Sequence, residues 1–195
     1  MSKLYIVILG FFTTSYILNA ILVGALPTRD KVQSLATLCG ILNYGEFTHD
    51  VSTHRLNDPN NPIKTYQTGH NGRVEYVRAE ITSASIGKGS APSDRARKYA
   101  RSMGKSNDDA GHIIANILGG TGRELYNIFP QSININRGVW SRIENDIRQT
   151  VVRSGQTVEV VVQLYYATPT DTRPTHFMYR ANNGNSCHTA DVNNP

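Results

Sequence analysis

The chain has 195 residues, a formal net charge of +5 at pH 7 and a hydrophobic fraction of 39%. This length is typical of one folded domain, and the apolar content is sufficient for a packed core, so disorder of the whole chain is excluded. Two cysteines are too few for a disulfide-dense miniprotein or a cysteine-rich zinc module, and the mild basic excess permits an anionic partner without requiring one.

Residues 1–25 have the pattern of a secretory signal peptide. Lys3 precedes a long apolar run, and the run ends in small residues at Ala25. We therefore expect residues 1–25 to be removed and residues 26–195 to form a single, secreted domain. The alternative is a signal anchor, because the run is almost long enough to span a bilayer, but polar residues in its middle argue for cleavage.

The chain's cysteines, Cys39 and Cys187, lie near opposite ends of the expected secreted domain. In an oxidising compartment they can form one disulfide. Closing so long a loop would stabilise the fold by about 4–5 kcal/mol in the chain-entropy model. Two buried thiols are the alternative.

The N-terminal half of the expected domain combines a helix, a loop and a β-hairpin. Residues 30–42 have apolar spacing compatible with a short helix, and residues 43–62 are rich in Asn, Asp and Pro, which is typical of a loop. The β-favouring runs 63–68 and 73–82 flank an Asn-Gly pair within 69–72, which predicts a hairpin.

Residues 83–107 are rich in Ser, Gly, Lys and Arg and admit two interpretations. The simpler one is a solvated loop with a short helix around residues 94–103. The other is a basic flank for a phosphate backbone, formed by Arg95, Arg97, Lys98, Arg101 and Lys105.

The C-terminal half predicts a helix between strands. The β-favouring run 126–129 is expected to end at the proline that follows it. Apolar residues recur at helical spacing over 138–153, and 157–166 is the strongest strand candidate, with 175–180 as its antiparallel partner. The polar tail 182–195 is expected to be loosely held.

The centre of the sequence carries residue types that suit phosphodiester hydrolysis. His112 is a candidate general base because its neutral imidazole is available near pH 7. Asn136 offers a carbonyl oxygen of the kind that Mg²⁺ accepts. Glu144 and Arg148 follow on one stripe of the predicted helix and can point at the same metal and phosphate.

Three strings occur in order in this region: Asp109-Ala110-Gly111-His112, Asn127-Ile128-Phe129-Pro130-Gln131 and Ile135-Asn136-Arg137-Gly138-Val139-Trp140. With Glu144 and Arg148 after them, they resemble the motifs of the DNA/RNA non-specific endonuclease family. The resemblance implies an α+β fold with a ββα-metal (His-Me finger) core at about residues 108–153, flanked by antiparallel β-hairpins.

The same resemblance implies a role for each matching residue. His112 would be the general base, and Asn136 would be the direct protein ligand of Mg²⁺, with Mn²⁺ or another divalent cation as the alternative. Asn127 would hold the geometry of the histidine and the metal. Glu144 would bind the water shell of the metal, and Arg148 would stabilise the phosphate in the transition state.

One position departs from the family pattern, since Ala110 stands where the motif has arginine. The candidates to replace its guanidinium are Arg95, Arg97, Arg101 and Arg123. We expect the nucleic-acid backbone to be bound by Arg95, Arg97, Arg101 and Arg137.

The resulting expectation is a secreted, metal-dependent endonuclease that acts on DNA and RNA with little sequence preference. The first alternative is a secreted nucleic-acid-binding protein that kept the scaffold and lost catalysis. The departure from the motif at Ala110 is the observation that favours this alternative. The second is an anchored or structural secreted domain in which the motifs coincide by chance. The joint presence of His112, Asn136 and Glu144 argues against both alternatives.

Overall fold

The computed structural model describes residue 47 and residues 49–195. The predicted signal peptide, the predicted helix over 30–42 and Cys39 lie outside these residues, so each of them, and the Cys39–Cys187 disulfide, stays a prediction. Within the described part of the chain, no helix is both long enough and apolar enough to cross a membrane.

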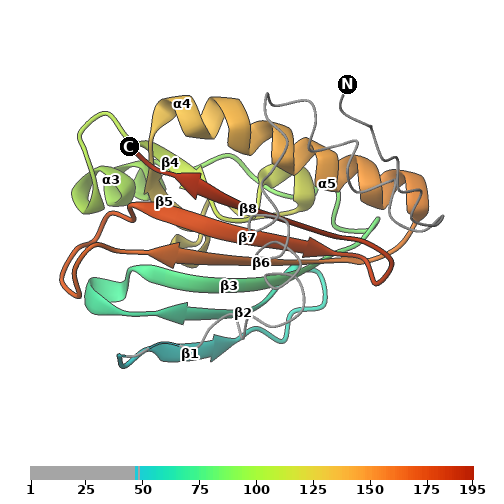
Figure 1. Cartoon of the computed structure of the whole chain (residues 1–195), viewed down its shortest axis with the longest axis horizontal. Coiled ribbons are helices and arrows are strands. Elements are labelled where there is room, and N and C mark those ends of the chain that lie inside the picture. Colours follow the sequence, from blue (N-terminus) through green and yellow to red (C-terminus); the bar gives the residue numbers. More distant parts are fainter. Residues whose placement is uncertain (1–46, 48) are drawn as a thin grey trace, which may run out of the picture.

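The main element is a six-stranded antiparallel sheet with the strand order β1-β2-β3-β6-β7-β8 (Figure 1). Its strands are β1 (Ser52–Arg55), β2 (Ile63–Thr68), β3 (Val74–Ile81), β6 (Val158–Tyr165), β7 (His176–Asn182) and β8 (Cys187–Asn193). The predicted hairpin is confirmed, because β2 pairs with β3 in antiparallel register. At its turn Asn71 has a φ of 53°, a left-handed conformation that asparagine tolerates. Pairing of β3 with β6 joins this hairpin to the predicted C-terminal strand pair.

A second sheet, three α-helices and several short 3-10 turns complete the described part of the chain. The sheet pairs β4 (Asp109–His112) with β5 (Ile128–Gln131). The helices are α3 (Asp94–Met103), α4 (Ile133–Ile135) and α5 (Ser141–Ser154), with a π-helical turn over Asn136–Trp140 before α5. Strand, strand and helix thus follow one another from β4 to α5, which is the ββα arrangement expected within an α+β fold.

The boundaries of α3 and α5 follow from local residue chemistry. The Ser93 hydroxyl accepts a hydrogen bond from the amide of Ala96 and so caps the first turn of α3. Gly155 ends α5 with a φ of 65°, which costs glycine little. The short helix expected within the basic segment and the longer helix expected over 138–153 are therefore both confirmed.

Three local predictions are wrong. β1 forms inside 43–62, which was expected to be loop. β5 continues through Pro130, because β5 pairs with β4 alone and the missing N–H of the proline falls at an edge strand. The tail is not loosely held: β8 pairs with β7, and the Asn194 side chain binds the carbonyls of Pro130 and Pro174 and the amide of Ser132.

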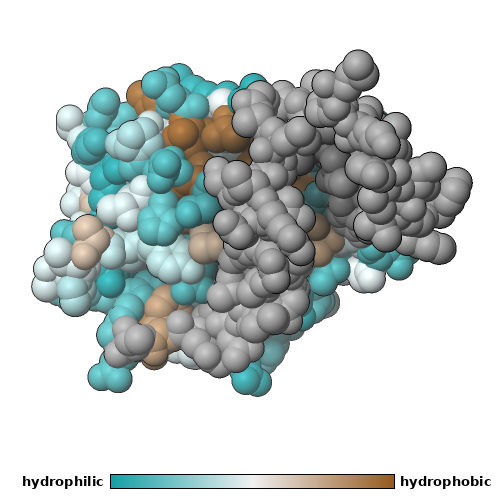
Figure 2. Space-filling view, in the orientation of Figure 1, coloured by the Kyte–Doolittle hydropathy of each residue, from teal (hydrophilic) through white to brown (hydrophobic). Residues whose placement is uncertain are grey.

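The core lies between the large sheet and the helical layer. Trp140, Ile147 and Val151 are buried against the apolar face of β6 and β7, where the Trp140 ring meets Phe177 edge-on at 4.9 Å. Each such side chain contributes roughly 1.5–3 kcal/mol through burial. The layer of α4 and α5 runs along the β6–β8 half of the sheet (Figure 1). On the visible part of this face, which is mainly hydrophilic, hydrophobic residues gather near α4 (Figure 2).

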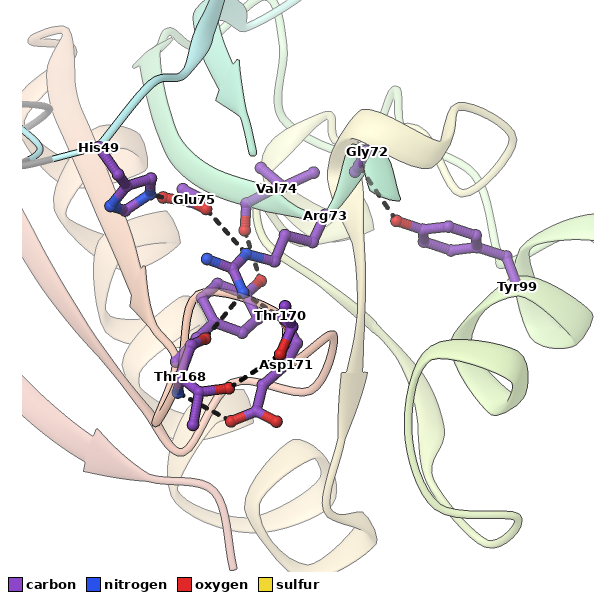
Figure 3. Close-up of polar contacts among 10 residues, drawn as sticks. His49, Gly72, Arg73, Val74, Glu75, Tyr99, Thr168, Thr170 and Asp171 are labelled. Carbon is purple, nitrogen blue, oxygen red and sulfur yellow. Dashed lines mark hydrogen bonds and ion pairs between the residues drawn. The ribbon is translucent and has the colours of Figure 1, made fainter. Parts of the chain in front are cut away.

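A buried ion pair ties the β6–β7 connection to the sheet (Figure 3). The Arg73 guanidinium donates to Glu75 at 2.8 Å, and both side chains are at most 3% exposed. Arg73 also donates to the carbonyls of Thr168 and Asp171 and lies 4.0 Å from the ring centre of Tyr166. A buried charge needs such partners, because desolvation of an unpaired ion costs several kcal/mol.

Candidate active site

His112 is the last residue of β4, and its ring is fixed from one side. The Nε2 atom lies 2.9 Å from the carbonyl oxygen of Ser90. A carbonyl can only accept, so Nε2 carries the proton and Nδ1 carries the lone pair in the neutral ring. Within the described residues Nδ1 makes no hydrogen bond. Burial of the ring lowers the pKa of His112, and the hydrogen bond to Ser90 offsets only part of that effect.

Asn127 holds the loop that follows His112. Its side chain is fully buried, and its Oδ1 accepts from the amide of Ile114 at 2.8 Å. Its Nδ2 donates to the carbonyls of Ile114 and Thr121. Asn127 thus acts on the backbone between β4 and β5 rather than pointing at the imidazole.

Two glycines allow the backbone around His112 to pack closely. A Cβ on Gly111 would lie 2.2 Å from the Gln131 side chain, across the β4–β5 pair. A Cβ on Gly120 would lie 1.7 Å from the carbonyl oxygen of Ile114. Neither position accepts a larger residue without displacement of its neighbours, which explains the glycine of the Asp109–His112 motif in packing terms.

Asn136 stands at the start of the π-helical turn and faces the other end of β4. Its Nδ2 donates to Asp109 at 2.9 Å, which orients the amide. Arg137 donates to both carboxylate oxygens of Asp109 at 3.0 Å each. Burial alone would raise the pKa of Asp109, but the hydrogen bonds from Arg137 and Asn136 hold it below its usual range. The Oδ1 of Asn136 has no hydrogen-bond partner within the described residues.

Glu144 and Arg148 follow on α5, on the helix stripe that begins with Trp140. The Trp140 indole donates to the carbonyl of His112 at 3.2 Å, so this stripe faces the end of β4. Glu144 is half-buried, and burial raises the pKa of its carboxyl to about 8. A carboxyl that loses solvation in this way is stabilised by a proton or by a cation.

The basic residues of the 83–107 segment lie on α3. Arg95, Arg97 and Arg101 are all exposed, and Arg97 pairs with Asp94 at 3.1 Å. Arg101 is close enough to Asp109 to lower the pKa of that carboxyl. Of the arginines predicted to bind the substrate, Arg137 pairs with Asp109 and Arg97 with Asp94, whereas Arg95 and Arg101 make no ion pair within the described residues.

Two contacts of the site were not predicted from the sequence. Ser90 orients His112 through its backbone carbonyl, and a backbone contact leaves no side-chain signature in a sequence. The Asp109–Arg137 pair joins residues 28 positions apart. The sequence shows that one of these residues is acidic and the other basic, but whether they meet depends on how α4 turns back toward β4.

Comparisons with known proteins assign the chain to a family. A family model described as DNA/RNA non-specific endonuclease matches residues 53–185. The probable deoxyribonuclease RhsA of Dickeya dadantii (strain 3937) is 36% identical over 115 residues, which cover 59% of this chain and 8% of RhsA. The type VII secretion system protein EssD of Staphylococcus aureus (strain USA300) is 31% identical over 121 residues, or 57% of this chain and 18% of EssD. The chain thus spans under a fifth of the length of these relatives.

Two solved structures, both of NucA from Streptococcus agalactiae, resemble the chain at 14% sequence identity. The magnesium-bound form gives a TM-score of 0.48 and covers 77% of this chain and 75% of NucA. The metal-free form gives a TM-score of 0.49 and covers 76% of this chain and 72% of NucA.

Proposed function

Since the chain belongs to the DNA/RNA non-specific endonuclease family, we propose that it is a secreted, Mg²⁺-dependent endonuclease that hydrolyses phosphodiester bonds of DNA and RNA. The observation that carries the proposal is the state of His112: its Nε2 donates to Ser90, its pKa is lowered by burial, and its Nδ1 is left with a free lone pair. Secretion rests on the signal-peptide pattern of residues 1–25.

His112 has the properties that a general base needs. Because burial lowers its pKa, the ring is neutral at pH 7 and can accept a proton. The contact with Ser90 keeps Nε2 protonated, so Nδ1 takes the proton from the attacking water. The oxygen of that water then forms the new bond to phosphorus while the bond to the leaving 3′-oxygen breaks, and that oxygen takes up a proton from solvent water. We expect products with 5′-phosphate and 3′-hydroxyl ends.

The motif residues that follow His112 in the sequence have the chemistry to hold a divalent cation. Asn136 would hold it through Oδ1, because Asp109 occupies Nδ2 and an amide oxygen suits Mg²⁺. Glu144 would bind water molecules around it, and a nearby positive charge would favour the ionised form of this half-buried carboxyl. What Mg²⁺ supplies when bound is neutralisation of the charge that develops on the phosphate and the leaving oxygen. Arg148, one turn after Glu144, would stabilise the phosphate.

Chelation and loss of Asn136 test the metal site together. We expect plasmid DNA and RNA to be cut in Mg²⁺ and to stay intact in EDTA. Asn136→Ala should need a much higher Mg²⁺ concentration for half-maximal activity, because it removes the proposed ligand oxygen. The matched control is Asn134→Ala, which changes an exposed asparagine two residues away and should behave as wild type.

Two outcomes of that experiment would overturn parts of the proposal. If Asn136→Ala and wild type respond identically to Mg²⁺, Asn136 is not the ligand. If the wild-type chain shifts nucleic acid on a gel but leaves it intact with every divalent cation, the protein is a binding protein that has lost catalysis.

The pH dependence of cleavage should report His112 and Glu144 separately. At saturating Mg²⁺, activity should fall with decreasing pH only below about 6.5, the ordinary histidine value, because the pKa of His112 is lowered and the ring must be neutral. At limiting Mg²⁺, activity should continue to rise up to about pH 8, since the proton on Glu144 competes with the cation. Glu144→Gln should abolish the rise in activity toward pH 8 at limiting Mg²⁺. If that rise persists in Glu144→Gln, Glu144 is not the group that causes it.

A further inference from the structure

A groove of about 320 Å³ lies beside the proposed active site, between the β1–β2 edge of the sheet, helix α3 and the segment before Asn127. The side chains that give it its chemistry are His54, Tyr66, Arg95, Tyr99, Glu124 and Tyr126. Apart from Arg95, which is predicted to bind the nucleic-acid backbone, none of them has a part in the proposed hydrolysis. In proteins that bind single-stranded nucleic acid, aromatic rings in such a groove are the side chains on which nucleobases stack.

Three of these rings form a continuous stack. His54 lies on Tyr66 with ring centres 4.5 Å apart and an interplanar angle of 13°. Tyr66 lies on Tyr126 at 4.7 Å and 18°. Tyr66 is thus covered on both faces, whereas His54 and Tyr126 each have one face that Tyr66 does not cover. Both outer rings are half-buried and line the groove.

The walls of the groove are fixed before any ligand binds. The Tyr126 hydroxyl accepts a hydrogen bond from Asn61 at 2.9 Å, which sets the rotation of that ring. The Tyr99 hydroxyl donates to the carbonyl of Gly72 at 3.3 Å and ties α3 to the β2–β3 turn (Figure 3). A preformed stacking surface loses little conformational entropy on binding.

Among the described residues that line the groove, one arginine can contact a phosphate of a polynucleotide strand. Within the described residues Arg95 makes no ion pair, so its guanidinium is available to a phosphate. Glu124 lines the same groove and offsets this charge. Binding in the groove would therefore depend mainly on stacking, with about one phosphate contact from Arg95.

The groove is close to the proposed base. Ile128 is the Cα partner of His112 across β4 and β5, and Tyr126 is two residues before it. Paired Cα atoms are about 5 Å apart and two residues span at most about 7 Å, so Tyr126 lies within roughly 12 Å of His112 along the backbone. With phosphates at least about 3.4 Å apart along a strand, this distance corresponds to a few nucleotides.

We propose that this groove is a nucleobase subsite, in which an unpaired base stacks on His54 or Tyr126 while Arg95 contacts a neighbouring phosphate. The bound base belongs to the strand being cut, a few nucleotides from the scissile phosphate. This inference rests on the proposed function for the identity of the strand. It adds that the enzyme prefers unpaired segments, since a base inside a duplex has no free face to stack.

The test measures binding of fluorescein-labelled single-stranded DNA of 12 nucleotides by anisotropy, using the full chain with His112→Ala and EDTA so that no cleavage occurs. One abasic residue is moved along the strand. At one position, loss of the base should weaken binding about tenfold, which is the scale of a single stacked base. That penalty should disappear when Tyr126→Leu or His54→Leu is added.

The matched control is His176→Leu. His176 also stacks on a tyrosine of the neighbouring strand, with its ring 4.6 Å from that of Tyr165, but it does not line the groove. This variant should keep the full abasic penalty. Arg95→Gln should keep the penalty too, while it reduces the slope of log Kd against log salt by about 0.7, the value for one phosphate of a single strand.

The outcomes separate the subsite from the nuclease itself. If the wild-type chain cuts DNA but no abasic position carries a penalty, or the penalty survives in both His54→Leu and Tyr126→Leu, the subsite is wrong and the nuclease stands. If the penalty behaves as expected but the wild-type chain cuts nothing, the subsite stands and the proposed function fails. If the chain binds no oligonucleotide and the wild-type chain cuts nothing in Mg²⁺, both fail.

Discussion

Replacement of His112 by alanine is expected to lower the rate of phosphodiester cleavage by about 10²–10⁴-fold, the usual contribution of a positioned general base. The variant loses Nδ1, the one ring nitrogen whose lone pair is free once Nε2 is bound to Ser90. Steady-state nicking of plasmid DNA at saturating Mg²⁺ measures the effect. Binding of nucleic acid should change little, because the contacts assigned to binding come from arginines and from the aromatic groove.

A purely structural role for His112 would give a different result. His112→Ala removes one hydrogen bond to Ser90, which costs the fold only about 1 kcal/mol, so the variant should melt near the wild-type temperature. Added imidazole should restore part of its activity by supplying a base in solution. His176→Ala, which changes a histidine outside the site, should cut as wild type. Cleavage by His112→Ala at the wild-type rate would overturn the assignment of the base.

The largest expected effect on stability is at the buried Arg73–Glu75 pair. Arg73→Leu leaves the Glu75 carboxylate, whose side chain is 1% exposed, without its main partner. Such a loss costs about 3–5 kcal/mol. For a domain of this size that lowers the melting temperature by roughly 6–20 °C. His49 also contacts Glu75, at 2.6 Å, but its side chain is 40% exposed and cannot replace the buried guanidinium.

Calorimetry or thermal denaturation by circular dichroism checks this expectation. Arg97→Gln is the matched control, because Arg97 pairs with Asp94 on the surface and such pairs contribute at most about 0.5–1 kcal/mol. The double variant Arg73→Leu with Glu75→Leu should recover part of the loss, since it removes the unpaired charge as well. A melting temperature of Arg73→Leu within 2–3 °C of wild type, on the order of 1 kcal/mol, would contradict the account of the pair as a stabilising contact.

Local patterns predicted well wherever neighbouring residues decide the structure. The hairpin around Asn71, the helix over 94–103 and the strand over 157–166 all formed as expected, because turn chemistry, capping and apolar periodicity act within a few residues. The prediction failed at Pro130 and in the tail. β5 pairs with β4 alone, so its edge tolerates the proline, and β8 pairs with β7, so pairing between strands outweighs local preference. A polar segment such as β8 becomes a strand because β7 offers it a free edge.

The sequence by itself determined the chemical identity of the candidate site. His112, Asn136, Glu144 and Arg148 stand in an order that predicts the ββα core, and the family comparison agrees with that reading. It determined the choice of residues because the residue type alone fixes which donor, acceptor and charged groups a side chain can offer. The single-domain assignment and the signal peptide stay predictions.

The tertiary structure decided how those residues are presented. It brought the Ser90 carbonyl to Nε2 of His112 and so left Nδ1 as the nitrogen available to the proposed base, and it brought Asp109 to Asn136 and so oriented the amide. It also assembled His54, Tyr66 and Tyr126 into one stack from three separate elements. The physical reason is the same in each case: a contact between distant residues depends on strand pairing and core packing, which no local pattern encodes.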